Sequence, residues 1–364
     1  MDTRNYRIIH TDTIRDNFLR IRQTIPAGIR TLAVVKSDAY GHGAYEVSKT
    51  VIDAGADMLA VATADEGAEL RQKGIEAPIL VLGAVTESEA GIGIRNRLIQ
   101  TVCSPEMVRM CEKYCLDSGM NCEVHLKIDT GMGRIGVRSH KELHEVLRTL
   151  DQCGCVKLTG VFTHFADADG ENSEYTVKQY QKFAEMLSEL PDGIIRHCAN
   201  SAAIHRYPEM QLDMVRIGIS LYGYPPVKND LRLDPAMEWH ASVSYVKNID
   251  AGEAVSYGMV WRSERPSRIA TVTCGYGDGY HRAATGKAAV LIHGKKVAVV
   301  GRICMDQLMA DVTELENVKP GDDVILIGRN GDESYTAEDL AQAAGTISYE
   351  VLLAATGRVM KIYD

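Results

Sequence analysis

Short apolar runs alternate with amphipathic stretches from about residue 31 to residue 220. Stretches such as GAYEVSKTVIDAG and SEYTVKQYQKFAEMLSEL carry apolar residues at helical spacing, and β-rich runs lie between them. This alternation is typical of parallel strands joined by crossover helices, and eight such units close into a (β/α)8 TIM barrel. The predicted strands are 31–36, 58–63, 78–83, 99–103, 122–129, 158–165, 195–200 and 215–220.

The pattern changes after residue 226, where strands and turns follow one another without long helices. His293-Gly294 and Asn330-Gly331 fit tight turns. A single helix is expected to begin at Thr336, in a capping box with Asp339, and to end near Gly345. The sequence therefore predicts an α/β fold in which a barrel domain (1–230) precedes a mainly β C-terminal domain (231–364).

Composition and charge narrow the class of protein. The chain has 364 residues, 45% of them hydrophobic, and a net charge of −9, which argues against nucleic acid or an anionic membrane as a partner. The N-terminus lacks an apolar signal stretch, and the longest apolar runs are too short to span a bilayer. The nine cysteines are scattered and odd in number, so reduced thiols and a cytoplasmic location are expected. None has the paired spacing of a zinc site, so no metal is expected.

Lys36 ends the apolar run Leu32–Val35 and is expected to open onto the carboxyl face of the barrel. Low-dielectric walls lower the pKa of such a lysine, and its free amine can bond covalently to an aldehyde cofactor. Position alone favours the simpler interpretation, a strand-end lysine that extends into water.

The segment around this lysine, AVVKSDAYGHG, resembles the pyridoxal 5'-phosphate (PLP) attachment motif of alanine racemases. Further segments resemble motifs of that family in the same order: VHLKIDTGMGRIGVR, THFADAD, HCANSAA, VRIGISLYG, GEAVSYGMVW, GYGDGY and VVGRICMDQLMADVT. The resemblance covers nearly the whole chain and implies a fold-type III racemase that converts L-alanine to D-alanine for cell-wall peptidoglycan precursors.

The resemblance assigns cofactor contacts to several residues. It places Tyr40, Asn200, Ser201, Gly218 and Ile219 around the cofactor phosphate, in agreement with the phosphate sites that follow the last strands of such barrels. Arg216 would face the pyridine nitrogen, and His164 would hold the ring and its arginine in place. Because arginine keeps its protons, the ring would stay a weak electron sink, which limits transamination.

Racemisation requires one proton-transfer group on each face of Cα. The resemblance gives these roles to Lys36 and Tyr257, and it implies a head-to-tail homodimer in which Tyr257 completes the site of its partner. Cys304, Met305 and Asp306 would lie beside Tyr257, with Met305 near the substrate carboxylate. By the same resemblance, residues Tyr276, Arg282 and Asp169 would line the corridor that admits the substrate.

Two further residues are assigned from the motif that ends in GMGR. Arg134 resembles the arginine that orients the substrate carboxylate. Lys127 stands where many relatives carry a carbamylated lysine, whose negative charge could hold Arg134. Carbamate and plain lysine are both compatible with the sequence.

One departure from the family pattern concerns substrate size. Gly357 stands where many alanine racemases have a tyrosine that reaches the active site. The missing ring motivates an alternative, a serine or mixed serine/alanine racemase of the vancomycin-resistance type, in which a membrane domain precedes the racemase. A PLP-binding protein without catalysis and an amino-acid decarboxylase are further alternatives. The β domain with Tyr257 argues against a PLP-binding protein without catalysis. Arg216 argues against a decarboxylase, because decarboxylases usually place a carboxylate at the ring nitrogen.

Overall fold

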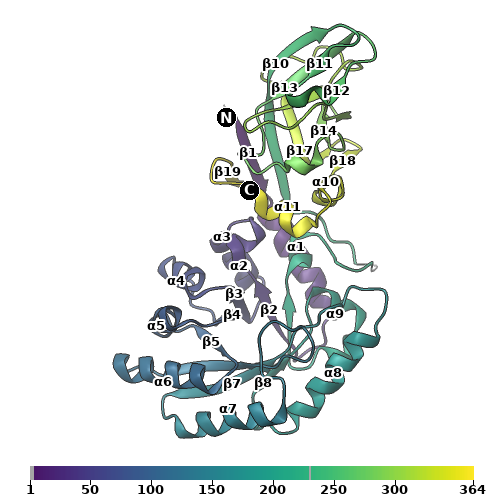
Figure 1. The fold of residues 1–364 in the computed structure, drawn as a ribbon. Coiled ribbons are helices and arrows are strands. Elements are labelled where there is room, and N and C mark those ends of the chain that lie inside the picture. Colours follow the sequence, from purple (N-terminus) through teal and green to yellow (C-terminus); the bar gives the residue numbers. More distant parts are fainter. Residues whose placement is uncertain (1–3, 229–230) are drawn as a thin grey trace. The chain divides into compact units, whose positions relative to one another are not determined.

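The eight strands predicted between residues 31 and 220 form one parallel sheet (Figure 1). In spatial order they are β8 (Ile195–His197), β7 (Val156–Phe162), β6 (Cys122–Lys127), β5 (Ile99–Val102), β4 (Ile79–Ala84), β3 (Met58–Val61), β2 (Arg30–Val34) and β9 (Met214–Ile217). Backbone hydrogen bonds from Asp213 to Arg196 (3.1 Å) and from Arg216 to Ala199 (3.0 Å) join the two outer strands. The sheet thus closes into the predicted barrel.

The computed structural model describes residues 4–228 and 231–364. The chain divides into a barrel unit, made of Ile14–Ala39 and Gly43–Asp234, and a β unit, made of Met1–Thr13, Tyr40–His42 and Pro235–Asp364. A single boundary near residue 230 does not describe this division, because two short N-terminal segments group with the C-terminal part.

Helices cover the outside of the barrel strands (Figure 1). After α1 (Thr11–Gln23), they are α3 (Ala44–Asp53), α4 (Ala64–Gln72), α5 (Glu87–Arg95), α6 (Pro105–Ser118), α7 (His140–Gln152), α8 (Glu174–Leu187) and α9 (Ser201–Arg206), with 3-10 turns η1 (Pro208–Met210) and η2 (Ile219–Tyr222). Local sequence sets several of their ends. The side chains of Thr63, Ser104 and Ser139 each accept a backbone hydrogen bond in the first turn of the helix that follows.

The barrel strands are covered on both faces. Every residue of β3, β5 and β9 is buried. Continuous apolar runs are expected for parallel strands enclosed in this way, which explains why these runs lack the alternation of a half-exposed strand.

The β unit contains a nine-stranded sheet built around one long strand. This strand, β10 (Met237–Ile249), pairs antiparallel with β1 (Asn5–Ile9), β13 (Ser267–Val272) and β17 (Asp323–Asn330). The remaining strands are β14 (Ala289–Ile292), β15 (Lys295–Ala298), β16 (Leu308–Asp311), β18 (Glu333–Tyr335) and β19 (Met360–Tyr363), and β11 (Ala254–Val255) pairs separately with β12 (Trp261–Arg262). The predicted order of a barrel followed by a mainly β domain is confirmed.

The predicted turns and cap of the β unit are also present, with one error. His293 and Gly294, at φ 50° and 72°, link β14 to β15. Helix α10 (Ala337–Ala344) begins with the expected capping box and ends at Gly345 in the left-handed region. The prediction of a single helix was wrong, because α11 (Ser348–Ala354) follows; this short helix has no side-chain cap that would have marked its start.

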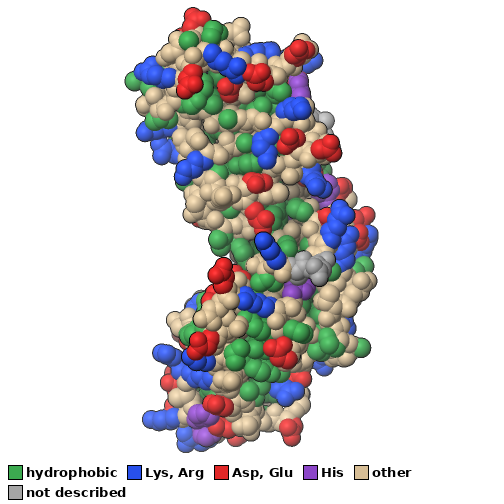
Figure 2. Space-filling view, turned by 90° about the vertical axis from the view of Figure 1, so that its right-hand side faces the viewer, with side chains coloured by type: hydrophobic (Ala, Val, Ile, Leu, Met, Phe, Trp, Pro, Cys, Tyr) green, Lys and Arg blue, Asp and Glu red, His purple; other side chains and the backbone are tan. Residues whose placement is uncertain are grey.

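Acidic and basic side chains are interspersed over the face drawn in Figure 2. Within the described ranges, none of the helices combines the length and apolar character needed to cross a bilayer.

Candidate functional site

Lys36 follows the carboxyl end of β2 directly. The strand ends at Val34, earlier than the predicted residue 36, because the chain turns sharply after Lys36. Four consecutive residues, Ser37 to Tyr40, have φ of 52° to 54° in the segment labelled α2 (Lys36–Tyr40). None of them is glycine, so this left-handed turn is strained and needs support from its surroundings.

Two carboxylates from the barrel unit support this turn. The Ser37 N–H donates to Glu66 at 2.6 Å, and the other oxygen of Glu66 accepts from Ala62 N–H at 2.7 Å. Asp38 accepts from the N–H of Ala44 at 2.9 Å. The role of Glu66 was not predicted, although this residue stands in the first turn of α4 beside the strand end.

The Lys36 amine is half-buried, and its pKa lies below the ordinary lysine value. Burial lowers the pKa most and the Arg134 guanidinium lowers it further, whereas Glu66 raises it. The amine therefore gives up its proton more readily than an exposed lysine does.

Arg216 lies buried on β9, within a set of hydrogen-bond acceptors. Its guanidinium donates to Nδ1 of His197 and Nδ1 of His164, both at 3.1 Å, and to the carbonyls of Thr163 (3.0 Å) and Cys198 (2.9 Å). Each imidazole accepts on Nδ1, so each is neutral with its proton on Nε2. Burial first and Arg216 second hold the pKa of both histidines well below the usual value.

The same chain of contacts continues into the barrel. Nε2 of His197 lies 3.0 Å from Nδ1 of His125, a residue that is also fully buried. Burial lowers the pKa of Arg216 to about 10, so it remains a cation at neutral pH. The sequence did not single out His197 or His125, because a histidine within an apolar strand usually packs in the core.

Lys127 is buried at the end of β6, only 2% exposed. Its Nζ donates to the Ile128 carbonyl at 2.7 Å and lies 5.4 Å from the ring centre of Phe162. Burial and then Arg216 lower its pKa to about 7. About half of the Lys127 amine is therefore unprotonated at neutral pH.

Polar groups gather where β8 and β9 end. Asn200 caps α9, and the Ser201 hydroxyl that follows accepts a hydrogen bond from Gly218 N–H at 2.8 Å. Ile219 begins η2, and the buried hydroxyl of Ser220 has no hydrogen-bond partner within the described part of the chain. This loop pair offers hydroxyl and amide groups of the kind that bind a phosphate.

Tyr40 belongs to the β unit and is buried. Its ring centre lies 6.0 Å from that of Tyr349. Burial and then Tyr349 raise the pKa of the Tyr40 phenol, which therefore stays protonated.

Tyr257 lies in a 3-10 turn, η3 (Tyr257–Met259), and its side chain is 70% exposed. The flanking residues Ser256 and Gly258 both have positive φ, 69° and 70°. A Cβ at Gly258 would lie 3.0 Å from the Arg302 guanidinium, which places a cation beside this turn. The Ser256 hydroxyl bonds to the Arg302 carbonyl at 2.6 Å and contacts the Cys304 thiol at 3.3 Å.

The loop from Cys304 to Asp306 packs on the GYGDGY segment. The Tyr276 N–H donates to the Cys304 carbonyl at 3.0 Å, and the Gly277 N–H donates to the Met305 carbonyl at 2.7 Å. The predicted neighbours of Tyr257 in the β unit are therefore joined to it through Ser256 and through this loop.

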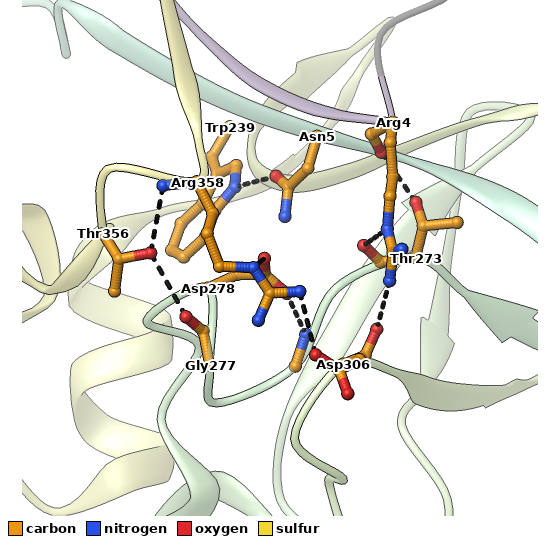
Figure 3. A network of polar contacts seen from close by, with 10 residues as sticks. Arg4, Asn5, Trp239, Thr273, Gly277, Asp278, Asp306, Thr356 and Arg358 are labelled. Carbon is orange, nitrogen blue, oxygen red and sulfur yellow. Dashed lines mark hydrogen bonds and ion pairs between the residues drawn. The ribbon is translucent and has the colours of Figure 1, made fainter.

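Two arginines brace the same loop, as Figure 3 shows. Arg358 contacts Asp306 at 2.8 Å and the buried Asp278 at 3.2 Å, and Arg4 donates to the Asp306 carbonyl at 3.0 Å. Gly357 was singled out in the sequence, whereas the role of its neighbour Arg358 was not predicted. Asp278, inside GYGDGY, was the available sign of a buried charge needing a partner.

Large apolar side chains around this loop are exposed. We call them the Tyr257 patch: Tyr257, Met259, Val260, Tyr276 and Met305, each at least 40% exposed. A cluster of this kind often marks a protein interface.

The barrel unit thus brings Lys36, Lys127, Arg134, His164 and Arg216 into one electrostatically linked group. Asp169, in the loop after β7, and Arg282, which begins η4 (Arg282–Ala284), take no part in the contacts described above.

Comparison with known proteins identifies the class. The family models described as alanine racemase N-terminal domain and alanine racemase C-terminal domain match residues 9–226 and 236–363. Alanine racemase of Clostridium perfringens strain SM101 is 42% identical, over 98% of this chain and 94% of the relative. Alanine racemase of Halothermothrix orenii is 39% identical, over 98% and 95%.

Solved structures with a similar fold are also alanine racemases. Alanine racemase of Clostridium difficile 630 has a TM-score of 0.94 at 40% identity and covers 100% of this chain and 96% of its own. Alanine racemase of Bacillus anthracis, solved with bound L-Ala-P, has a TM-score of 0.94 at 38% identity with the same coverage. The fold and these matches define an amino-acid racemase. The chain belongs to the alanine racemase family, as its motifs predicted.

Proposed function

We propose that this protein interconverts L-alanine and D-alanine with PLP as cofactor, and that its D-alanine serves peptidoglycan precursors. The observation that carries the proposal is the match of both domain models to a chain whose Lys36 amine is half-buried at the carboxyl end of the barrel. The curated relatives described above are named alanine racemases, which favours alanine as the substrate.

The residues at the barrel end fit this cofactor. When bound, PLP supplies an aldehyde that bonds to amines and a ring that withdraws electrons from Cα. Lys36 would hold the aldehyde carbon, and Ser201, Gly218 and Ile219, with Tyr40, would hold the phosphate. The buried Arg216, whose position is set by His164 and His197, would donate to the ring nitrogen and remain protonated.

Two groups would move the Cα proton. The Lys36 amine, with its lowered pKa, would take or return the proton on one face. The Tyr257 phenol of the partner subunit would act on the other face, and the Arg302 guanidinium lies beside its turn. The exposed Tyr257 patch supports a head-to-tail homodimer, because a second copy could cover it.

Substitution of Tyr257 tests this assignment. We expect Tyr257→Phe to lower kcat for racemisation by about 10²–10⁴ in both directions while PLP absorbance and folding are retained, because only the proton-transfer group is lost. Tyr245→Phe is the matched control, since Tyr245 is an exposed tyrosine of the same unit. Unchanged kcat in Tyr257→Phe would refute the two-base assignment.

We propose that Arg134 binds the substrate carboxylate together with Met305 and Asp306, and that Lys127 carries a carbamate that orients Arg134. An unprotonated amine is the form that adds CO2, and the Lys127 pKa of about 7 makes that form abundant. With ¹³C-labelled bicarbonate, a carbamate resonance should appear in the wild type and be missing in Lys127→Ala. A wild-type spectrum without that resonance would leave Lys127 a plain lysine.

One observation favours serine as the alternative substrate. A Cβ at Gly357 would meet nothing within 4 Å, so space is open where many relatives carry a tyrosine. Comparing kcat/KM for L-alanine and L-serine decides between them, and Gly357→Tyr should lower the serine value selectively if that space admits the larger substrate. Residues Asp169, Tyr276 and Arg282 of the proposed corridor are further positions where substitution would alter substrate size.

A further inference from the structure

Three buried cysteines lie close together on the outer side of the barrel. Cys111 and Cys115 lie one turn apart on α6, and Cys122 is the first residue of β6. The Cys122 side chain lies near both and shifts the pKa of each thiol. Among the described residues, no group of His, Cys, Asp and Glu side chains has an arrangement suited to a metal ion, so these thiols do not form a metal site.

A fourth cysteine, Cys155, lies beside this group in the segment before β7. The Cys155 N–H donates to the carboxylate of Glu112 on α6 at 3.1 Å, and the Cys155 carbonyl accepts from Cys122 N–H at 2.8 Å. Its charge acts on the Cys115 thiol. Cys155 is partly exposed, unlike Cys115 and Cys122.

A cavity of about 1360 Å³ leads to this cluster. It lies at the amino ends of β4 to β7, so it is at the end of the barrel opposite to Lys36. Cys155 and Cys122 both line it. Four cationic side chains and two carboxylates also line it: Arg71, Arg95, Arg97, Lys157, Glu76 and Glu123. The excess of positive charge in the lining favours binding of an anionic small molecule.

We propose that Cys111, Cys115, Cys122 and Cys155 form a site of reversible oxidation, which an anionic low-molecular-weight disulfide reaches through this cavity. The proposal is independent of the racemase chemistry, because none of the residues assigned to that chemistry belongs to the cluster or lines the cavity.

The reaction is thiol–disulfide exchange in two steps. The Cys155 thiolate attacks one sulfur of the small disulfide RSSR, which forms a Cys155–SR mixed disulfide and releases one RS⁻. Cys115 then attacks the Cys155 sulfur and releases the second RS⁻. The two protons lost by Cys155 and Cys115 pass to these two thiolates. Two protein thiols are thereby oxidised to one disulfide, and RSSR is reduced to two RSH.

Contacts inside the cluster determine where the disulfide can move afterwards. Cys122 lies near Cys115 and Cys111, so further exchange would transfer the bond to the buried pair without a new oxidant. The hydrogen bond from Cys122 lowers the pKa of the Cys111 thiol, although burial opposes this. Cys111 is therefore a suitable nucleophile for that transfer.

The test treats the PLP-loaded, full-length protein with glutathione disulfide, which is anionic, and separately with cystamine, which is cationic. Free thiols are alkylated at intervals, and the peptides are mapped by mass spectrometry without reduction. We expect an internal disulfide within the cluster in the wild type, formed several-fold faster with glutathione disulfide than with cystamine.

Variants identify the first thiol and the resolving thiol. Cys155→Ser should slow oxidation at least about tenfold, because the accessible thiol is gone. Cys153→Ser, the matched control, should leave the rate unchanged, since Cys153 is also partly exposed but does not line the cavity. In Cys115→Ser, the product should stop at a glutathione adduct on Cys155.

Three results would overturn the proposal: cluster thiols that stay fully alkylatable in the wild type, equal oxidation rates in wild type and Cys155→Ser, or a faster reaction with cystamine. The comparison of the two disulfides needs no variant, so it decides the matter even if a serine variant fails to fold.

Discussion

Burial and hydrogen bonding act in opposite directions on individual side chains of this protein. At Lys127, burial dominates and lowers the pKa to about 7. At His240 on β10, burial lowers the pKa, but hydrogen bonds to Asp323 and Glu238 outweigh it and raise the pKa to about 9. Burial therefore leaves a lysine that loses its proton readily and a histidine that stays charged, depending on the acceptors within reach.

The His240 shift predicts a pH-dependent stability. Because its folded pKa of about 9 lies above the unfolded value of about 6.5, the stabilisation is fully present below pH 6.5 and is lost as pH rises towards 9. Urea unfolding at pH 6, 7.5 and 9 should show this loss, and His240→Gln should reduce the slope. His293→Gln is the control, since His293 pairs with Asp322 but is much more exposed. An identical slope in His240→Gln and wild type would contradict the prediction.

At the scale of an element, the left-handed turn after β2 depends on side chains outside the turn. Its four positive φ angles are unfavourable for residues with a Cβ, and the turn persists because Glu66 and Asp38 satisfy its backbone N–H groups and that of the next helix. The position of Lys36 therefore depends on a carboxylate from another helix.

Glu66→Gln should weaken this support. The amide can accept only one of the two backbone hydrogen bonds, so we expect a loss of about 1–3 kcal/mol in stability and a lower kcat as Lys36 loses its fixed position. Glu69→Gln, at an exposed position of the same helix, is the control. Chemical denaturation and initial rates give both readouts, and equal stability in the two variants would show that Glu66 does not hold the turn.

A second element, the Cys304–Asp306 loop, depends on Arg358 in a similar way. Arg358→Gln would leave the buried Asp278 without its cation and release one of the two arginine braces on Asp306. We expect KM for alanine to rise about tenfold with a smaller change in kcat, because the proposed role of the loop is to bind substrate and not to transfer its proton. Arg265→Gln, which breaks an exposed pair with Glu314, should change neither constant. A normal KM in Arg358→Gln would exclude the loop from substrate binding.

For the whole molecule, the proposed dimer makes each site depend on two chains. A mixed dimer of Lys36→Ala and Tyr257→Phe would contain one site with both groups intact and one with neither. Equal amounts of the two inactive variants, unfolded and refolded together, should therefore recover about one quarter of wild-type activity, because half the dimers are mixed and each has one working site of two. Each variant refolded alone is the control. No recovery, with mixed dimers present by mass spectrometry, would place both groups in one chain.

Much of the fold could be predicted from the sequence because its signals are local. Apolar runs of strand length marked all eight barrel strands, and the Thr336–Asp339 box with Gly345 marked α10. The errors lie where local signals are weak or overridden: α11 has no cap, and β2 stops at Val34 because a supported turn replaces the strand.

The sequence by itself determined the order of barrel and β parts, the family, and the residue types available for chemistry at each strand end. Only the tertiary structure decided that Glu66 holds the turn after Lys36, that His197 and His125 stand behind Arg216, and that Cys122 and Cys155 line one cavity. The physical reason is that periodicity and capping act over a few residues. Burial, pKa and hydrogen-bond partners depend on which distant residues the folded chain brings together.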